Sequence, residues 1–383
     1  MSTKNTPANF STPRLAQPLA AVCLALAALP ALAQQDTPAS AASAPASAPA
    51  PLQLPTDVKP VSLNAEDLDI EDGAALRGLK KVALAGVAVY VVNEASAGGS
   101  AGAVYRDRTM ASVNTSLKVV GLDSARLQAL ADSTHDRIVD ALRARGIEVL
   151  PLAELKALPA YAELAAIGEP QPMPLDARGG KGQVFSAHGL PLIHQSELMW
   201  HNRTVGGLFG AKVEDRFAGI GDGFAAALRK PKLDAALDGI AKSSNAAIVM
   251  ARLVLTAAQV KGSGGAWASS ASTSVRNSLF MPAWTNRLWV RRPDGQQGRV
   301  SLKNALASDY AIGEIVDVTS TGTKAANIAL TAFTMLAAMS GTGRGVVASS
   351  QDLELRSSPE LFEAVALPQI QGVAEGLSRA LEP

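Results

Sequence analysis

Cysteine is almost absent from this chain, since the only one among its 383 residues is Cys23. That residue lies in an apolar run near the N-terminus. If the run is removed, the remaining protein has no thiol for nucleophilic catalysis, metal ligation or disulfide bonding. Its stability must then come from a packed core. Aromatic residues make up only 4% of the chain, so we expect a core of Ala, Val and Leu.

Long blocks of like charge are also missing. The formal net charge is +1, and loss of Lys4 and Arg14 with the N-terminal segment would change it to −1. A general binder of nucleic acid or of membrane surfaces is normally more basic than this. We therefore expect no nucleic-acid partner.

The N-terminal 33 residues have the pattern of a secretory signal peptide. Lys4 and Arg14 precede the apolar run 15–29, and Ala31-Leu32-Ala33 ends in an Ala-x-Ala cleavage site before Gln34. The run is too short for a membrane span. We expect export, into a bacterial periplasm or beyond. Two alternatives remain open: acylation of Cys23 in a lipoprotein, or an uncleaved signal that acts as an inner-membrane anchor.

The composition divides the rest of the chain in two. Residues 34–78 begin with a stretch rich in Ala, Pro and Ser, which predicts a disordered tether. Residues 79–383 are expected to form a single α/β (or α+β) domain, with an irregular insertion expected at 159–223, where Pro and Gly recur. Its predicted architecture is a mixed sheet with helices packed on it and an amphipathic helix at the C-terminus.

Hydrophobic periodicity predicts the main elements of that domain. The expected elements are buried strands at 81–92 and 246–255, a half-exposed strand at 111–120, an amphipathic helix from Asp123 to Arg145, a buried helix at 328–339, and a C-terminal helix capped by Ser357 and Glu360. The segment 95–102, rich in Gly, Ala and Ser, is expected to be a turn.

A candidate binding surface lies in a predicted hairpin strand. Arg287, Trp289 and Arg291 alternate with apolar residues and so point to one side of the strand. Trp284 and Trp267 lie just upstream. On an exposed face, these side chains could hold a protein partner or an anionic envelope polymer by stacking and charge. The alternative is a sheet surface stabilised by cation–π contacts.

Ser100 is the one candidate nucleophile. Gly98-Gly99-Ser100-Ala101-Gly102 has the Gly-x-Ser-x-Gly spacing of a serine hydrolase, in which a histidine such as His188 would be the base. That motif needs a helix directly after the serine, whereas the residues that follow predict a strand. A flexible turn is therefore favoured, and a secreted serine hydrolase is kept as an alternative.

The remaining polar clusters predict no metal site and no cofactor. His194, Glu197 and His201 are the set to test for a metal ion, but their spacing matches neither helical ligation nor a zinc ribbon. Asp132, Asp136 and Asp140 recur at helical spacing among arginines, which favours a solvated charged face. The glycine clusters at 219–223 and 341–345 match no phosphate-binding fingerprint and predict turns.

Three pieces of the sequence resemble a known module. They are Lys80–Leu84, Leu127–Val149 and Ser244–Val249, in the order strand, helix with strand, and strand. The pattern is similar to the periplasmic α/β module of the curli secretion component and of the N-terminal domain of the Tol-Pal translocation protein, and to exported proteobacterial proteins. It covers about half the chain. It implies a non-catalytic role in the cell envelope and carries no site residues.

These observations lead to one expected function and two alternatives. We expect an exported, non-catalytic binding or assembly factor of the cell envelope. The alternatives are the serine hydrolase and a self-assembling subunit associated with the outer membrane. The expected partner is an envelope protein or an anionic envelope polymer, and oligomer formation is possible.

Overall fold

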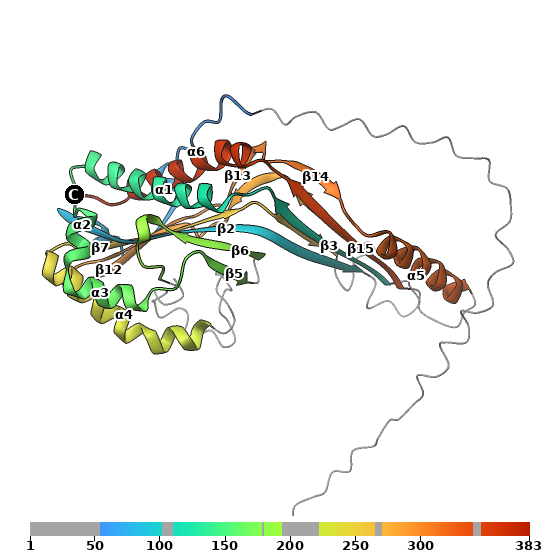
Figure 1. The fold of residues 1–383 in the computed structure, drawn as a ribbon, viewed down its shortest axis with the longest axis horizontal. Coiled ribbons are helices and arrows are strands. Elements are labelled where there is room, and N and C mark those ends of the chain that lie inside the picture. Colours follow the sequence, from blue (N-terminus) through green and yellow to red (C-terminus); the bar gives the residue numbers. More distant parts are fainter. Residues whose placement is uncertain (1–53, 102–109, 178–179, 194–221, 265–269, 340–345) are drawn as a thin grey trace, which may run out of the picture. The chain divides into compact units, whose positions relative to one another are not determined.

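A large mixed β-sheet is the centre of the computed structural model, which describes residues 54–101, 110–177, 180–193, 222–264, 270–339 and 346–383 (Figure 1). Within these residues, thirteen strands join one sheet and two more form a small second sheet. Helices pack around the large sheet, and the last of them lies at the C-terminus. The predicted fold class is therefore confirmed.

The longest path through the sheet has eight strands. In spatial order they are β1 (Leu68–Glu71), β12 (Gln297–Leu302), β11 (Arg287–Arg291), β7 (Ala247–Thr256), β2 (Lys81–Ala101), β3 (Met110–Val120), β15 (Val346–Arg356) and β14 (Glu314–Asp317). Beside this path lie β4 (Glu148–Val149), β5 (Met173–Ala177), β6 (Gly180–Ser186), β10 (Ser278–Met281) and β13 (Leu306–Ala311). The small sheet pairs β8 (Gln259–Ser263) with β9 (Ser272–Arg276).

The two central strands are β2 and β7, which run parallel from the pair Val82–Ala247 to the pair Val92–Thr256. All of β7 and residues 82–92 of β2 are buried. A strand with apolar residues on both faces is stable only where both faces are covered. The buried strands that the sequence predicts at 81–92 and 246–255 are thus confirmed.

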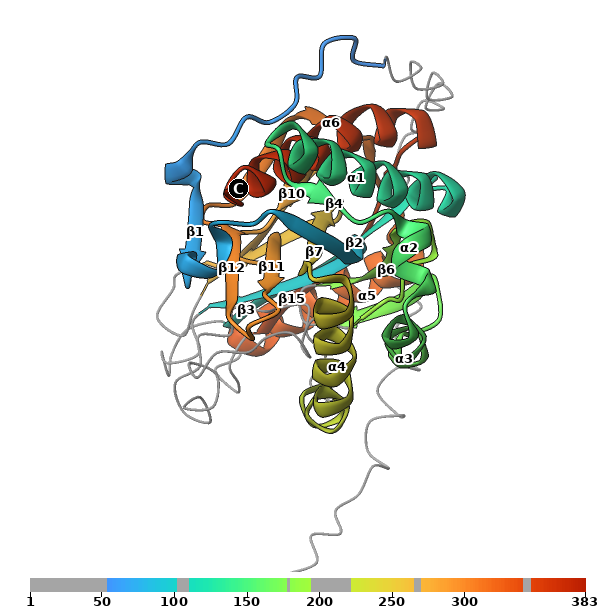
Figure 2. The ribbon, with the colours of Figure 1, turned by 90° about the vertical axis from the view of Figure 1, so that its left-hand side faces the viewer.

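Helices cover both faces of this central region (Figure 2). On one face lie α1 (Ser124–Ala144) and α6 (Pro359–Ser378), whose apolar side chains pack with Val82 and Val249. On the other face lie α2 (Leu152–Ala157), α3 (Pro159–Ile167) and α4 (Asp222–Ser244), which pack with Ala83 and Ile248. Neighbouring residues of one strand therefore enter different cores, as the alternation of side chains requires.

Helix α1 follows its local sequence signals. The Asp123 carboxylate accepts a hydrogen bond from the N–H of Ala125 at 2.9 Å, and Gly146 follows the helix with a φ of 80°. Its buried side includes Leu127, Leu130, Thr134, His135, Ile138 and Leu142. The predicted amphipathic helix is confirmed, and one histidine lies on its buried side.

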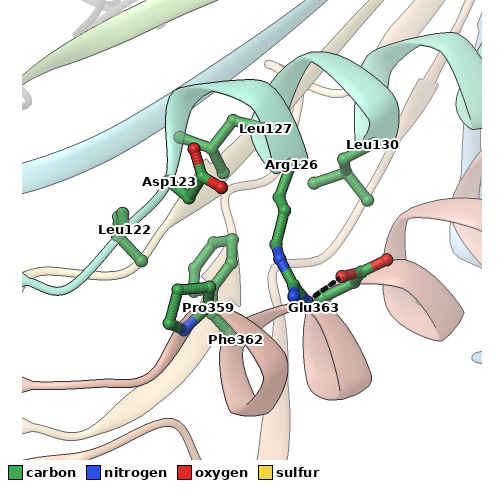
Figure 3. A pocket seen from close by; sticks show the side chains of 8 residues that line it. All are labelled: Leu122, Asp123, Arg126, Leu127, Leu130, Pro359, Phe362 and Glu363. Carbon is green, nitrogen blue, oxygen red and sulfur yellow. Dashed lines mark hydrogen bonds and ion pairs between the residues drawn. The ribbon is translucent and has the colours of Figure 1, made fainter.

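Ion pairs join the start of α1 to α6 (Figure 3). The Arg126 guanidinium lies 2.9 Å from the Glu363 carboxylate and 2.8 Å from that of Glu360. The cavity beside them has a volume of about 10 Å³, which is room for about one water molecule. This junction is a packing contact and has no space for a larger ligand.

The cap of α6 differs from the prediction. Ser358 is the N-cap, because its Oγ accepts a hydrogen bond from the N–H of Leu361 at 3.1 Å. Ser357 instead donates its hydroxyl to the carbonyl of Ile312, and Glu360 pairs with Arg126. The predicted capping box of Ser357 and Glu360 is therefore wrong, because the N-cap is the next residue, Ser358.

The turn predicted at 95–102 is also wrong, because β2 continues to Ala101. Small residues are used here for close approach of two sheets, and not for a bend. A Cβ on Gly99 would lie 2.2 Å from the carbonyl oxygen of Ser263, and one on Gly262 would lie 2.1 Å from that of Gly98. The β8–β9 hairpin thus rests directly on the backbone of β2.

The folded part begins before residue 79. Strand β1 pairs with β12, and Leu63 and Leu76 are buried in the core with Leu79. The short helices η1 (Ala65–Asp67) and η2 (Gly73–Leu76) flank β1. The prediction of a disordered segment is therefore wrong for residues 63–78, because this stretch carries enough leucine and isoleucine to join the sheet.

The stretch 159–223, expected to be irregular, contains regular elements where the structure describes it. They are α3, the β5–β6 hairpin and the short helix η3 (Ala187–Gly189). Strand β6 pairs with β2 from Ala88 to Glu94. Residues 194–221 lie outside the described residues.

Candidate functional site

The strand predicted to form an exposed binding face is β11, and all five of its residues are buried. It pairs with β7 on one side and with β12 on the other. Trp289 packs in the same core as the helices α2 to α4. The expectation of an exposed Arg and Trp face is therefore wrong, because a helical layer covers the side of the strand that the alternation marks as polar.

Arg291 of β11 connects the sheet to helix α4 by two ion pairs. Its Nε lies 2.6 Å from Oδ1 of Asp238, and its Nη1 lies 2.8 Å from Oδ1 of Asp234, both on α4. Only 9% of the Arg291 side chain is exposed. This arginine is saturated by two carboxylates of its own chain, so an anionic polymer has no access to it.

Trp284 is the exception among the predicted binding residues. It is 43% exposed, and its φ of 56° puts its backbone in the left-handed region. Its N–H donates to the carbonyl of Leu302 at 2.7 Å, which holds the turn before β11. Trp267 lies outside the described residues. The structure thus brings Arg287, Trp289 and Arg291 together inside the protein and leaves Trp284 apart at the surface.

Ser100 lies inside strand β2, where it pairs with Ser112 of β3. The strand-to-helix turn of a hydrolase is therefore not formed at this serine. The proposed partner His188 lies two residues beyond Ser186, which pairs with Ala88 of the same strand. Ser100 is twelve residues farther along β2, which at about 3.3 Å per residue is a distance of roughly 40 Å. A Ser100–His188 pair is excluded by this geometry.

Apolar side chains are exposed around the start of helix α5 (Thr321–Met339). Ile328 is 70% exposed, Leu330 is 41% exposed, and Val318, just before the helix, is 39% exposed. The helix lies beside the first half of β15 (Figure 1), and the Asn327 side chain donates to the carbonyl of Ser350 at 3.0 Å. The buried helix predicted at 328–339 is therefore helical but is exposed at these two positions.

A cleft of about 420 Å³ opens between the start of α1 and the strands β2 and β6. Its charged lining residues are Glu94 and Lys181. Glu94 pairs with Lys118 at 3.3 Å, and Lys181 pairs with Asp176 at 3.4 Å. Because these charges are already balanced within the protein, the cleft does not define a charged ligand.

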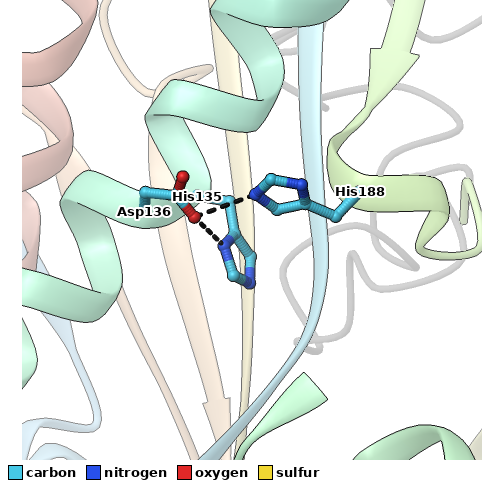
Figure 4. Close-up of side chains that lie close together, drawn as sticks. All are labelled: His135, Asp136 and His188. Carbon is cyan, nitrogen blue, oxygen red and sulfur yellow. Dashed lines mark hydrogen bonds and ion pairs between the residues drawn. The ribbon is translucent and has the colours of Figure 1, made fainter. Parts of the chain in front are cut away.

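Two histidines and an aspartate converge between α1 and η3 (Figure 4). Oδ1 of Asp136 lies 3.0 Å from Nδ1 of His135 and 2.8 Å from Nε2 of His188. The two imidazole rings meet edge to face, with centroids 4.9 Å apart. One potential ligand atom from each residue lies within 4.8 Å of the other two. This is the one such group of three His, Cys, Asp or Glu side chains among the described residues.

The backbone of His188 is held in an uncommon conformation. Its φ of 48° and ψ of 31° are left-handed, a conformation that costs a residue with a Cβ about 1–2 kcal/mol. Its N–H donates to Oδ1 of Asp132 at 2.7 Å, and its carbonyl accepts from Nζ of Lys156 at 3.0 Å. Gln128 donates to the same oxygen of Asp132 at 2.9 Å. Side chains of α1 and α2 therefore fix both the backbone and the ring.

Burial and hydrogen bonding set the charges of this cluster. Burial of the His135 ring lowers the pKa of its imidazole below the usual 6.5. Partial burial acts to raise the pKa of Asp136, but hydrogen bonds from His135 and His188 outweigh it, so the pKa of this carboxyl is lowered from 3.8. At neutral pH, Asp136 is thus a carboxylate and His135 is a neutral imidazole.

The sequence did not predict this cluster. His188 is 52 residues from Asp136 along the chain, so no local spacing connects them. The only local signal is the row Asp132 and Asp136, one helical turn apart, which was interpreted as a solvated face. Both contact His188 of η3, and Asp136 is 63% exposed at the same time. Asp140 is exposed, as expected. His194, Glu197, His201 and both glycine clusters predicted as turns lie at least partly outside the described residues.

Comparison with known proteins gives no relative for this chain: no protein-family model matches it, and neither a curated protein nor a solved structure is significantly similar. Among the described residues, no helix is long and apolar enough to cross a membrane. The site and the surfaces described above therefore carry the functional argument.

Proposed function

We propose that this chain is an exported, non-catalytic assembly protein of the cell envelope that associates with further copies of itself through helix α5. The proposal of export rests on the N-terminal signal pattern that ends at Ala33. The observation that carries the proposal of assembly is the exposure of three apolar side chains on α5 or just before it, Val318, Ile328 and Leu330.

Water contact at these side chains is unfavourable. Burying one large aliphatic side chain is worth about 1.5–3 kcal/mol, so covering Ile328 and Leu330 would favour association. Exposed apolar groups that gather on one element are typical of a contact with a partner. Half of the six large hydrophobic residues that are exposed in the described part of the chain lie on α5 or just before it.

The charge of the surface argues for a second copy as the partner. The one charged residue on α5 is Lys324, and it pairs with Asp317 at 3.2 Å. An anionic polymer would require unpaired cations, and a helix that lies on a lipid surface normally carries several lysines or arginines on its polar face. A helix that exposes apolar side chains and carries one paired charge can pack against the same helix of a second copy, as a two-fold contact between identical chains requires.

Sedimentation velocity of the purified chain starting at Gln34 tests the proposal. We expect an oligomer whose population rises with protein concentration. The double variant Ile328→Asp with Leu330→Asp should sediment as a monomer with unchanged circular dichroism. The matched control is Ile70→Asp, a residue that is 49% exposed on β1, at the opposite end of the strand order. A monomeric wild-type chain, or equal oligomers for both variants, would contradict the proposal.

Export is tested separately by the mass of the protein recovered from the cell envelope. Cleavage predicts a chain that begins at Gln34. A chain that begins at an acylated Cys23 would still be exported, but with a lipid anchor in place of a free N-terminus. Recovery of only the full-length chain from the cytoplasm would contradict export.

A further inference from the structure

We propose that His135, Asp136 and His188 bind one divalent first-row transition-metal ion, such as Zn²⁺, between α1 and η3. This inference is independent of the assembly through α5. It rests on the convergence of three ligand side chains and on the way the fold holds His188 (Figure 4).

The separations of the two histidine nitrogens from Asp136 suit a shared ion, and all three ligand atoms lie within 4.8 Å of one another. Two atoms bound to one ion at about 2.1 Å lie about 3.0 Å apart at a right angle and about 3.4 Å apart at the tetrahedral angle. Asp136 Oδ1 lies 3.0 Å from His135 Nδ1 and 2.8 Å from His188 Nε2. An ion could therefore replace the hydrogen bonds of the cluster after small side-chain rotations.

The constrained backbone of His188 is a second, independent observation. A residue in the left-handed region is retained when its surroundings impose it, and such residues cluster at functional sites. Here Asp132 binds the N–H of His188 and Lys156 binds its carbonyl. A histidine whose side chain merely pointed to solvent would not need this arrangement, which aims its Nε2 at Asp136.

The donor set indicates the class of ion. Two imidazole nitrogens with one carboxylate oxygen suit Zn²⁺, Cu²⁺, Ni²⁺ and Co²⁺, whereas Ca²⁺ and Mg²⁺ prefer oxygen ligands throughout. The ligands differ in access to solvent: His135 is buried, while the side chains of His188 and Asp136 are 33% and 63% exposed. The open side leaves at least one coordination position for water.

The ion would connect α1 to η3, beside a stretch of β2 that lacks a described paired strand on one side. Strand β2 pairs with β4 as far as Val82 and with β6 from Ala88 onward, and between them no described strand pairs with this edge. Helix η3 lies against β2 and α1 there. Because the ion would bind the folded chain and not the unfolded one, it should stabilise the fold.

Isothermal titration of the metal-free chain starting at Gln34 with ZnCl₂ at neutral pH, without a histidine tag, tests the site. We expect one Zn²⁺ per chain. His188→Ala and Asp136→Asn should each weaken binding at least tenfold, by loss of a ligand. Asp140→Asn, one turn farther along α1, and the double variant His194→Ala with His201→Ala should bind as the wild type does.

The melting temperature gives a second readout that does not depend on heats of binding. Zn²⁺ should raise the melting temperature of the wild type and of Asp140→Asn, but not that of Asp136→Asn, whose exposed side chain is not needed for folding. MgCl₂ should have no effect. The proposal is overturned if the wild type binds no Zn²⁺ in a saturable way, if His188→Ala and Asp136→Asn bind it unchanged, or if binding is lost only with His194 and His201.

Discussion

At the scale of the residue, burial decides whether a charged side chain binds a partner or holds the fold. Arg291 has the residue type and the strand position of a binding arginine, yet it contacts Asp234 and Asp238 of α4. Its pairing is the clearest case in this chain of a polar face that serves packing between layers.

Replacing Arg291 should therefore lower stability. For Arg291→Met we expect a loss of about 1–3 kcal/mol in the free energy of unfolding, less than for a fully buried pair because both aspartates are partly exposed. Urea unfolding measures it. Arg292→Met, a change at a more exposed neighbour, is the control and should cost under about 0.5 kcal/mol. Equal small losses for both variants would show that Arg291 is not a structural arginine.

Asp317 makes a pH-dependent contribution at the start of α5. Hydrogen bonds from the side chain and backbone of Thr319, with further help from Lys324, lower the pKa of Asp317 from 3.8 to about 2. The stabilisation is complete above 3.8 and is lost as the pH falls toward about 2, because the unfolded chain takes up the proton first. In urea midpoints measured over that range, Asp317→Asn should show a shallower fall than the wild type. Parallel curves would refute this role.

Single residues also mark the limit of what the sequence could predict. The alternation in 287–291 correctly placed Arg287, Trp289 and Arg291 on one side of a strand. The burial of Trp289 and Arg291 depends on α4, more than fifty residues earlier in the chain, which no local pattern reveals. The cluster of His135, Asp136 and His188 could not be predicted for the same reason, because it forms only when α1 and η3 pack together.

At the scale of the element, caps and hydrophobic periodicity predict a helix or strand that is defined by its own residues. They do not predict an element that depends on contacts with distant segments. The cap at Asp123, the regular apolar stripe and Gly146 together define α1, so this helix could be predicted with its boundaries. Residues 95–101 have no comparable local signals. Their small side chains fit a turn or a close sheet contact equally well, and the pairing with β3 and the contact with the β8–β9 hairpin decide for the strand.

That contact between sheets gives a test at the same scale. A Cβ on Gly262 would lie 2.1 Å from the carbonyl oxygen of Gly98 and 2.7 Å from its carbon. Gly262→Ala should therefore push β8–β9 away and speed hydrogen exchange of its amides, with little effect on β7. Gly322→Ala, where the nearest atom would be 3.9 Å away, is the matched control. Unchanged exchange in both variants would mean that the hairpin does not rest on the glycines.

At the scale of the whole molecule, the fold class could be predicted because the local hydrophobic periodicity of the sequence indicates buried strands and amphipathic helices. The order of the thirteen strands and the exposure of α5 come from long-range pairing. The apolar run 328–339 predicts a buried helix, because its composition is apolar and it is too short to span a membrane. Within a single copy, Ile328 and Leu330 are exposed, and this difference leads to the assembly that we propose.

Disulfide cross-linking tests that central claim most directly, because the chain starting at Gln34 contains no cysteine. A cysteine placed at Ile328 should meet its counterpart if α5 packs against α5 of a second copy. Mild oxidation of Ile328→Cys at low protein concentration should give a covalent dimer on non-reducing gels, whereas Ile70→Cys, also exposed but on β1, should stay monomeric. Monomers from both variants, or dimers from both in equal amount, would contradict the assembly through α5.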